Sequence, residues 1–170
     1  RTMSALRANS TVIFRQCPRF ARSESVGNHF SAATSADGRQ FLLIPRWQHF
    51  ATIEGDDLLL LDADDPGVMA GPDAPDASAW TVHGTLHRML PEARVLLHCR
   101  SPYAVAPSCL KDPMLPPIDN NTARLLGRIG YGLRFGGRGD DAAARPPLAH
   151  PIAETATRPM GDHVRACAWA

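Results

Sequence analysis

Two histidines of the chain, His83 and His87, are separated by four residues in a segment with helical character. Residues four apart lie one above the other on a helix, so the two imidazoles would share a face with a spacing that can bind a metal ion. A stable metal site needs further ligands, and no third one is evident beside them. We therefore expect these histidines to pack on one helix face or to meet solvent.

The four cysteines form no recognisable metal or redox motif. They are Cys17, Cys99, Cys109 and Cys167, and none lies in a C-x-x-C spacing, which argues against a zinc knuckle or a dithiol pair. Thiols in a reducing compartment are expected, which favours a cytoplasmic protein. A mitochondrial location is the alternative, because residues 1–22 hold five arginines and no acid, as transit peptides do.

The bulk composition is that of an ordinary globular chain. Its 170 residues suit one domain with one core, which we assign to residues 1–170, with residues 1–9 as a candidate tail and 136–170 weakly patterned. The net charge of +1 predicts no nucleic-acid partner. No apolar run approaches the roughly 18 residues of a membrane helix, so no membrane span is expected.

The elements that must position any chemistry alternate between helices and short strands. A Gly-Asn turn precedes one strand, and Asp37-Gly38 is a two-residue hairpin signal. Strands are expected at 41–44, 58–61 and 94–99; helices are expected at 1–22 with an interruption at Pro18, at 78–90 with Ser78 as N-cap, from Ser101, and at 120–131. This mixture indicates an α/β fold around a largely antiparallel sheet.

Three segments, in order, resemble motifs of the class II aldolase/adducin family. Residues 25–31 (SVGNHFS) resemble its Gly-Asn-(His/Ile)-Ser loop. Residues 91–104 (PEARVLLHCRSPYA) resemble its central block, which carries a His-x-His-Ser-Pro-Tyr core. Residues 115–124 (LPPIDNNTAR) resemble a Leu-Pro-Pro-Ile-Asp-Gln-Asn-Thr stretch of its adducin-like branch. Three matches in the family's order are more specific than any one of them.

The resemblance implies an αβα fold with a central, mostly antiparallel sheet, here shortened at its C-terminal end. Family enzymes cleave or isomerise sugar phosphates and related carbonyl compounds. In them a zinc ion held by three histidines polarises the substrate and a glutamate moves the proton. The adducin branch uses the same domain in a cytoskeletal protein without that enzymology. Members are often homotetramers, so protein partners or a homo-oligomer are expected.

Mapped onto this chain, the implied zinc site is incomplete. His98 matches the first histidine of the His-x-His motif, but Arg100 occupies the second position, and a guanidinium offers no lone pair to a metal. His163 is the candidate third ligand, with His150 less favoured. The expectation is no cofactor, or residual zinc on His98 and His163. Cys99, between His98 and Arg100, is expected to point into the core.

The implied general base is also missing. The run Ala77-Ser78-Ala79-Trp80 resembles the family's Ser-Ser-Glu-x run, and Ala79 stands at the glutamate position. Asp76 is the nearest acid and would substitute only after a loop rearrangement. No confident catalytic residue remains.

The same resemblance gives candidate anion-binding residues. Gly27 and Asn28 match a phosphate-binding loop, where backbone amides at a glycine turn can cradle an anion. Arg46 replaces part of a second, degraded phosphate loop. A tight turn that simply needs a glycine is the alternative explanation for Gly27.

The sequence therefore favours a catalytically degenerate class II aldolase/adducin-like protein that acts as a structural or binding subunit within a larger assembly. The alternative is a zinc-dependent aldolase, lyase or epimerase acting on sugar phosphates or related carbonyl compounds. It would use His98, His163 and His150 as ligands and Asp76 as base. A decayed gene product and a small anion-binding module built on Gly27, Asn28 and Arg46 stay open.

Overall fold

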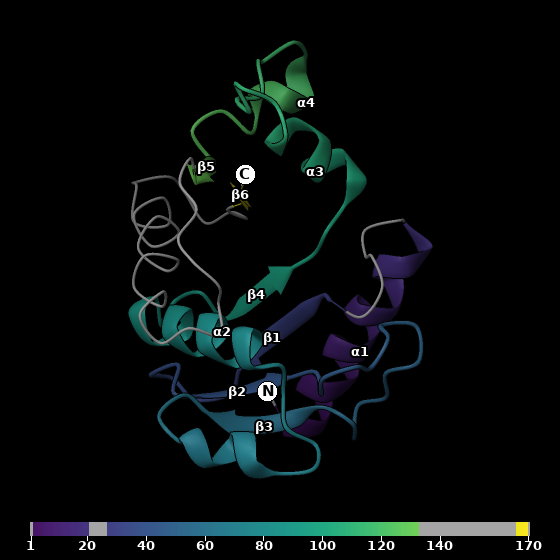
Figure 1. Cartoon of the computed structure of the whole chain (residues 1–170), viewed down its shortest axis with the longest axis vertical. Helices are drawn as coiled ribbons and strands as arrows, with labels where there is room; N and C mark the ends of the chain where they lie inside the picture. Colours follow the sequence, from purple (N-terminus) through teal and green to yellow (C-terminus); the bar gives the residue numbers. More distant parts are fainter. Residues whose placement is uncertain (1, 21–26, 133–165, 170) are drawn as a thin grey trace.

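The computed structural model describes residues 2–20, 27–132 and 166–169. Helices and strands alternate along them, which confirms the predicted α/β class (Figure 1). The order is α1 (Met3–Arg19), β1 (His29–Ala33), β2 (Gln40–Leu43), β3 (Leu59–Asp62), the 3₁₀ turn η1 (Pro66–Ala70), α2 (Ala77–Met89), β4 (Val95–His98), α3 (Pro102–Ser108), α4 (Asn120–Ala123), β5 (Ile129–Gly132) and β6 (Ala166–Trp169).

A four-stranded sheet in the order β3-β2-β1-β4 forms the centre of the molecule. Every neighbouring pair is antiparallel, as the sequence predicted. The register pairs Ser31 with Leu43 on one side and with Leu96 on the other. Because side chains alternate along a strand, this register decides which residues share a face.

One face of the sheet packs on α1. Phe14 of the helix stacks on Phe30 of β1, with ring centroids 5.1 Å apart, and meets the edge of Phe50. Arg7 and Arg15 donate hydrogen bonds to carbonyls of the 53–58 loop. Pro18 lies in the last turn, so it does not interrupt the helix as predicted. Residues 3–9, considered as a candidate tail, form its first turns.

The opposite face packs on α2, which gives three layers: helix, sheet, helix. Phe41 and Leu43 of β2 form a buried cluster with Ala79 and Trp80 of the helix. The N-cap is Asp76 rather than the predicted Ser78, and its carboxylate accepts from the amides of Ser78 and Ala79. An acceptor two to three residues upstream satisfies two of the four free amides of the first turn.

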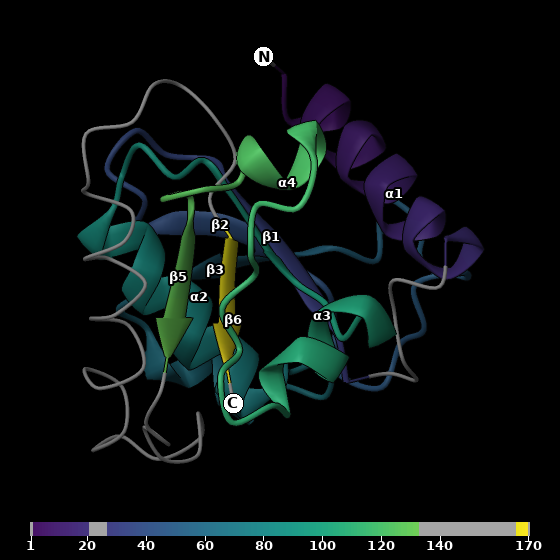
Figure 2. The same cartoon turned by 90° about the horizontal axis from the view of Figure 1, so that it is seen from above.

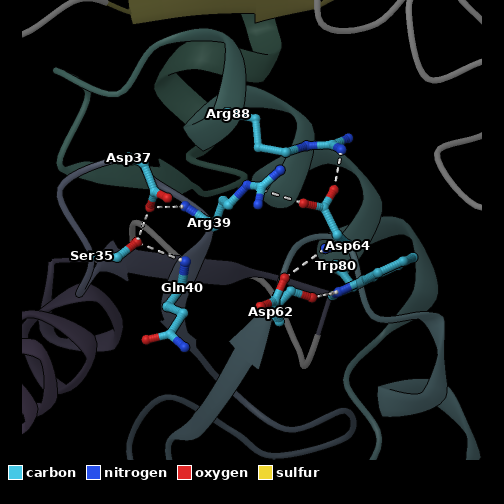
Figure 3. A network of polar contacts seen from close by, with 8 residues as sticks. All are labelled: Ser35, Asp37, Arg39, Gln40, Asp62, Asp64, Trp80 and Arg88. Carbon is cyan, nitrogen blue, oxygen red and sulfur yellow. Dashed lines mark hydrogen bonds and ion pairs between the residues drawn. The ribbon is translucent and has the colours of Figure 1, made fainter.

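Polar contacts near both ends of α2 hold the helix against the sheet (Figure 3). Asp64 bridges Arg88 of the helix, at 2.5 Å, and Arg39 of the hairpin, at 3.3 Å. Trp80 donates its indole N–H to the carbonyl of Asp62. The predicted two-residue hairpin is instead a longer loop from Thr34 to Arg39, in which Gly38 has φ +74°.

β4 differs from its predicted burial. It lies at the edge of the sheet, and on the α1 side Val95 and Leu97 are 47% and 55% exposed. The helix α1 covers β1 and β2 but does not extend over this strand. Cys99, expected in the core, is exposed as well.

The remaining described elements form a group beyond β4 (Figure 1). Strands β5 and β6 lie side by side as a parallel pair, with α3 next to them (Figure 2). The helix predicted at 120–131 is wrong in extent: α4 spans one turn, Gly127 follows at φ +70°, and β5 begins at Ile129. Within the described residues, no helix is long and apolar enough to span a membrane.

Candidate functional site

The candidate site lies at one end of the central sheet, where β1 begins, β4 ends and α2 begins. His29 on β1 is the direct cross-strand partner of His98 on β4. Their rings stack with centroids 4.3 Å apart and planes 9° from parallel. Antiparallel pairing thus places a second imidazole beside His98, although the two residues are far apart in the sequence.

His29 also contacts the buried face of α2. Its Nδ1 lies 2.7 Å from Nε2 of His83, and the two rings meet edge to face. His83 and His87 are both fully enclosed between the helix and the sheet. The prediction that they pack on one helix face is confirmed, with burial rather than solvent on that face.

Ser31 joins the two buried helix histidines. Its hydroxyl oxygen lies 2.5 Å from Nδ1 of His83 and 2.7 Å from Nε2 of His87. The other nitrogen of His87, Nδ1, lies 3.0 Å from the carbonyl oxygen of Ala93. We call this series of contacts, from His29 through His83, Ser31 and His87 to Ala93, the histidine chain.

The three histidines of the histidine chain, His29, His83 and His87, are neutral at pH 7. Desolvation on burial, together with a smaller effect of the neighbouring His98, lowers the pKa of His29 to about 3. Burial likewise lowers the pKa of His83 well below its usual value and that of His87 to about 4. The pKa of His98 is lowered by burial and by the charge of Arg100. A neutral imidazole has one N–H donor and one lone pair.

The direction of every hydrogen bond in the histidine chain follows from its last member, the carbonyl group of Ala93. A carbonyl oxygen only accepts, so His87 donates from Nδ1 to Ala93 and its Nε2 is an acceptor. Ser31 must then donate to His87 and accept from Nδ1–H of His83.

The same reasoning fixes the proton position on His29, at the end of the sheet. Because Nδ1 of His83 carries its proton, its Nε2 is an acceptor and Nδ1 of His29 must donate to it. His29 is therefore held as the Nδ1–H tautomer, with an unprotonated Nε2. The chain fixes which atom of His29 is free to accept a hydrogen bond at the sheet end.

Arg100 places a positive charge next to these histidines. Its guanidinium lies against Gly27, where a Cβ atom would come within 3.0 Å of Nη1. The backbone amide of Arg100 donates to Oδ1 of the buried Asn28 at 2.9 Å. Among the described residues, no hydrogen bond or ion pair involves the guanidinium itself.

The two candidate positions for the general base, Ala79 and Asp76, do not supply one. Ala79 is 1% exposed and packs into the cluster under α2. Burial raises the pKa of Asp76, but the hydrogen bonds from Ser78 and Ala79 outweigh it and leave the pKa below its usual value. A carboxylate that is ionised and occupied as a helix cap is a weak proton acceptor.

The predicted metal and anion ligands are only partly brought together. His98, Gly27 and Asn28 lie at the same sheet end, whereas Arg46 is exposed on the turn after β2. His150 and His163 lie outside the described residues. Within the described part of the chain no group of three metal-ligating side chains is arranged to hold a metal ion, and Arg100 supplies a cation where a ligand would be needed. The described residues at this sheet end therefore do not fit a three-histidine zinc site.

Sequence reasoning missed His29 and Ser31 as members of the site. His29 received no role beyond its place in the motif of residues 25–31, and it is the first residue of β1. The available signal was their spacing. Positions 29 and 31 are two apart and so share one face of a strand, and positions 83 and 87 are four apart and so share one face of a helix. Two polar faces of matching polarity would be expected to pack together.

A helix–sheet–helix sandwich around an antiparallel sheet is the fold that the resemblance to the class II aldolase/adducin family implied. The chain belongs to the family described as the class II aldolase and adducin N-terminal domain, whose model matches residues 11–170. The resemblance deduced from the three motifs is thus confirmed.

Individual relatives agree with this assignment. An adducin-related protein of Schizosaccharomyces pombe is 28% identical over 99 residues, covering 55% of this chain and 31% of that protein. An aldolase II superfamily protein from Pseudomonas syringae has a TM-score of 0.74 at 21% identity, covering 88% of this chain and 59% of the other.

L-fuculose 1-phosphate aldolase from Glaciozyma antarctica has a TM-score of 0.71 at 17% identity, covering 91% of this chain and 58% of the other. At these identities the structural matches show the fold alone. The chain spans less than two thirds of the length of each of these three proteins.

Proposed function

We propose that this chain is a binding or structural subunit with the class II aldolase/adducin fold that does not carry out aldolase chemistry. The observation that carries the proposal is Arg100, whose guanidinium lies beside His98 and Gly27 at the position implied for a zinc-binding histidine. A permanent cation there opposes a second cation through Coulomb repulsion and contributes no lone pair.

The helix α2 supports the proposal independently. Ala79 offers no proton acceptor, and Asp76 is committed to capping the helix. Loss of a general base typically costs ~10²–10⁴ in rate. The match to an adducin-related protein favours the non-enzymatic branch of the family, and with it a role that depends on a protein partner or a second copy of the chain.

The proposal is tested by metal analysis and turnover on the same preparation. The purified chain is expected to hold well under one zinc per molecule and to leave L-fuculose 1-phosphate uncleaved. Arg100→His should raise zinc retention, because it removes the cation and adds an imidazole next to His98. Arg46→His is the matched control and should not.

A different result would favour the alternative, a zinc-dependent aldolase, lyase or epimerase. One tightly bound zinc per wild-type chain, together with turnover while Ala79 is in place, would overturn the proposal.

A further inference from the structure

We propose that His29 and Arg100 form a metal-free binding site for a small hydroxycarboxylate, in which Arg100 takes the carboxylate and Nε2 of His29 accepts a hydrogen bond from the hydroxyl. This inference rests on the proposed function, because a zinc ion beside His98 would itself take the oxygens of such a ligand.

The first step is the geometry of the sheet end. Gly27 lies two residues before His29, Arg100 lies two residues after its cross-strand partner His98, and the Arg100 guanidinium lies against Gly27. Two residues of extended chain advance by about 7 Å. The guanidinium, which also acts electrostatically on His29, therefore lies at a distance from it that a molecule of a few carbon atoms can span.

The second step is the chemistry of the cation. A guanidinium presents a planar fork of N–H donors that matches a carboxylate in bidentate geometry. In the described residues Arg100 has no acidic partner to occupy that fork. Gly27 leaves room beneath it, since any larger residue would bring a Cβ atom to 3.0 Å from Nη1.

The third step is the acceptor. The histidine chain holds His29 with Nδ1–H turned to His83, so its Nε2 has a lone pair and no proton. A hydroxyl donates to such an atom, whereas a carboxylate or a methyl group does not. A ligand with both groups satisfies the site, and a simple carboxylate leaves the His29 nitrogen unpaired.

The negative charge near His29 limits the net charge of the ligand. Asp76 lies close enough to act electrostatically on His29. Its negative charge favours a monoanion at the site and disfavours a second carboxylate on the hydroxyl side. The expected ligand is thus a small monocarboxylate with a hydroxyl group.

The test compares four probes on EDTA-treated protein by calorimetric titration: lactate, propionate, 1,2-propanediol and malate. Lactate should bind at least about tenfold more tightly than propionate, which lacks the hydroxyl, and than malate, which adds a charge. 1,2-Propanediol lacks the carboxylate and should bind most weakly. Equal binding of lactate and propionate would overturn the inference.

Two variants assign the atoms. Arg100→Gln should weaken lactate and propionate alike, by about tenfold or more. His29→Asn keeps an amide N–H at the Nδ1 position for His83 but removes Nε2, so it should abolish the preference for lactate and leave propionate unchanged. Arg19→Gln, at an exposed position in the last turn of α1, is the matched control and should behave as wild type.

The outcomes separate the two proposals. Undiminished lactate binding by Arg100→Gln, with its thermal midpoint unchanged, would refute the site. A stoichiometric zinc ion in the untreated protein would refute the proposed function, while the titrations of EDTA-treated protein would still decide whether the hydroxycarboxylate site exists.

Discussion

Ser31 is the residue on which the buried histidines depend. Its hydroxyl donates to His87 and accepts from His83, so it links the two rings. It lies directly across the sheet from Leu43 and Leu96, among apolar neighbours. A hydroxyl in such surroundings is tolerated because its donor and one of its acceptor positions are used.

Replacing this hydroxyl should be costly. Ser31→Ala leaves two buried ring nitrogens without partners, so we expect the free energy of unfolding to fall by about 2–4 kcal/mol. Ser4→Ala, at an exposed position of α1, should change it by less than about 0.5 kcal/mol. Chemical denaturation of both variants measures the difference. Equal stability of the two would show that the histidine chain is not formed.

The residues of the site illustrate what the sequence could and could not predict. His98 and Arg100 lie in a recognisable motif, so their place was predicted from the chain alone. The contacts of His29 and Ser31 with His83 join residues 52 and more positions apart. They depend on the strand register and on the rotation of α2, which no local pattern fixes.

At the scale of elements, α2 is held at both ends. Asp76 caps its first turn, and Arg88 pairs with Asp64 near its last. The β1–β2 loop also approaches it closely, because a Cβ atom on Gly38 would come within 2.1 Å of the carbonyl oxygen of His87. The position of the loop therefore fixes the helix turn that carries His87.

A substitution in this loop should disturb the helix contact. Gly38→Ala adds a methyl group into the backbone of His87 and also strains a residue with φ +74°, so we expect a loss of at least about 2–3 kcal/mol.

Gly71→Ala is the control, since open space surrounds that residue and its φ is −76°. Its effect should be near zero or slightly stabilising. Denaturant titrations of the two variants measure the change in the free energy of unfolding. A Gly38→Ala variant as stable as the wild type would mean that the loop and the helix are not in contact.

Element boundaries were predicted with mixed success for identifiable reasons. The strands at 41–44 and 58–61 have continuous apolar runs and were placed within one or two residues. The 120–131 segment has apolar residues at helical spacing, but α4 ends at Ala123 and the chain continues in i→i+3 turns. Gly127 then takes a left-handed conformation before β5 begins, so the periodic pattern did not produce a long helix.

At the scale of the whole molecule, the sheet is covered unequally. The fold class and the antiparallel order followed from the alternation of elements and from the motifs. The exposure of Val95 and Leu97 did not, because an apolar strand reads as buried in the sequence. The exposure of β4 depends on how far α1 extends across the sheet, and the sequence of the strand itself carries no information on this.

The buried neutral histidines also set how the stability of the whole molecule varies with pH. The folded pKa of His87 is about 4, below the ordinary value of 6.5, so the unfolded chain takes up the proton first. The free energy of unfolding should therefore fall as the pH is lowered below about 6.5, and this loss should continue until the pH approaches 4.

For His87 alone, the free energy of unfolding should fall by about 3 kcal/mol. Its pKa is lowered from 6.5 to about 4, and each pKa unit corresponds to 1.36 kcal/mol. Urea titrations between pH 7 and 4.5 measure the slope, in a range above the ordinary titration of carboxylates. His87→Asn, which can still donate to Ala93, should make the slope shallower by the contribution of this one histidine, while the other buried histidines keep theirs. A flat profile in the wild type would contradict the burial of neutral imidazoles.

The carbonyl of Ala93, at the inner end of the histidine chain, has a consequence for proton movement. A row of imidazoles and a hydroxyl can pass a proton along only if its last member can accept one and release it again. An amide oxygen is far too weak a base for that, so a proton arriving at Nε2 of His29 has no exit inside the protein. The series can orient His29, but it cannot conduct protons from the sheet end to the interior.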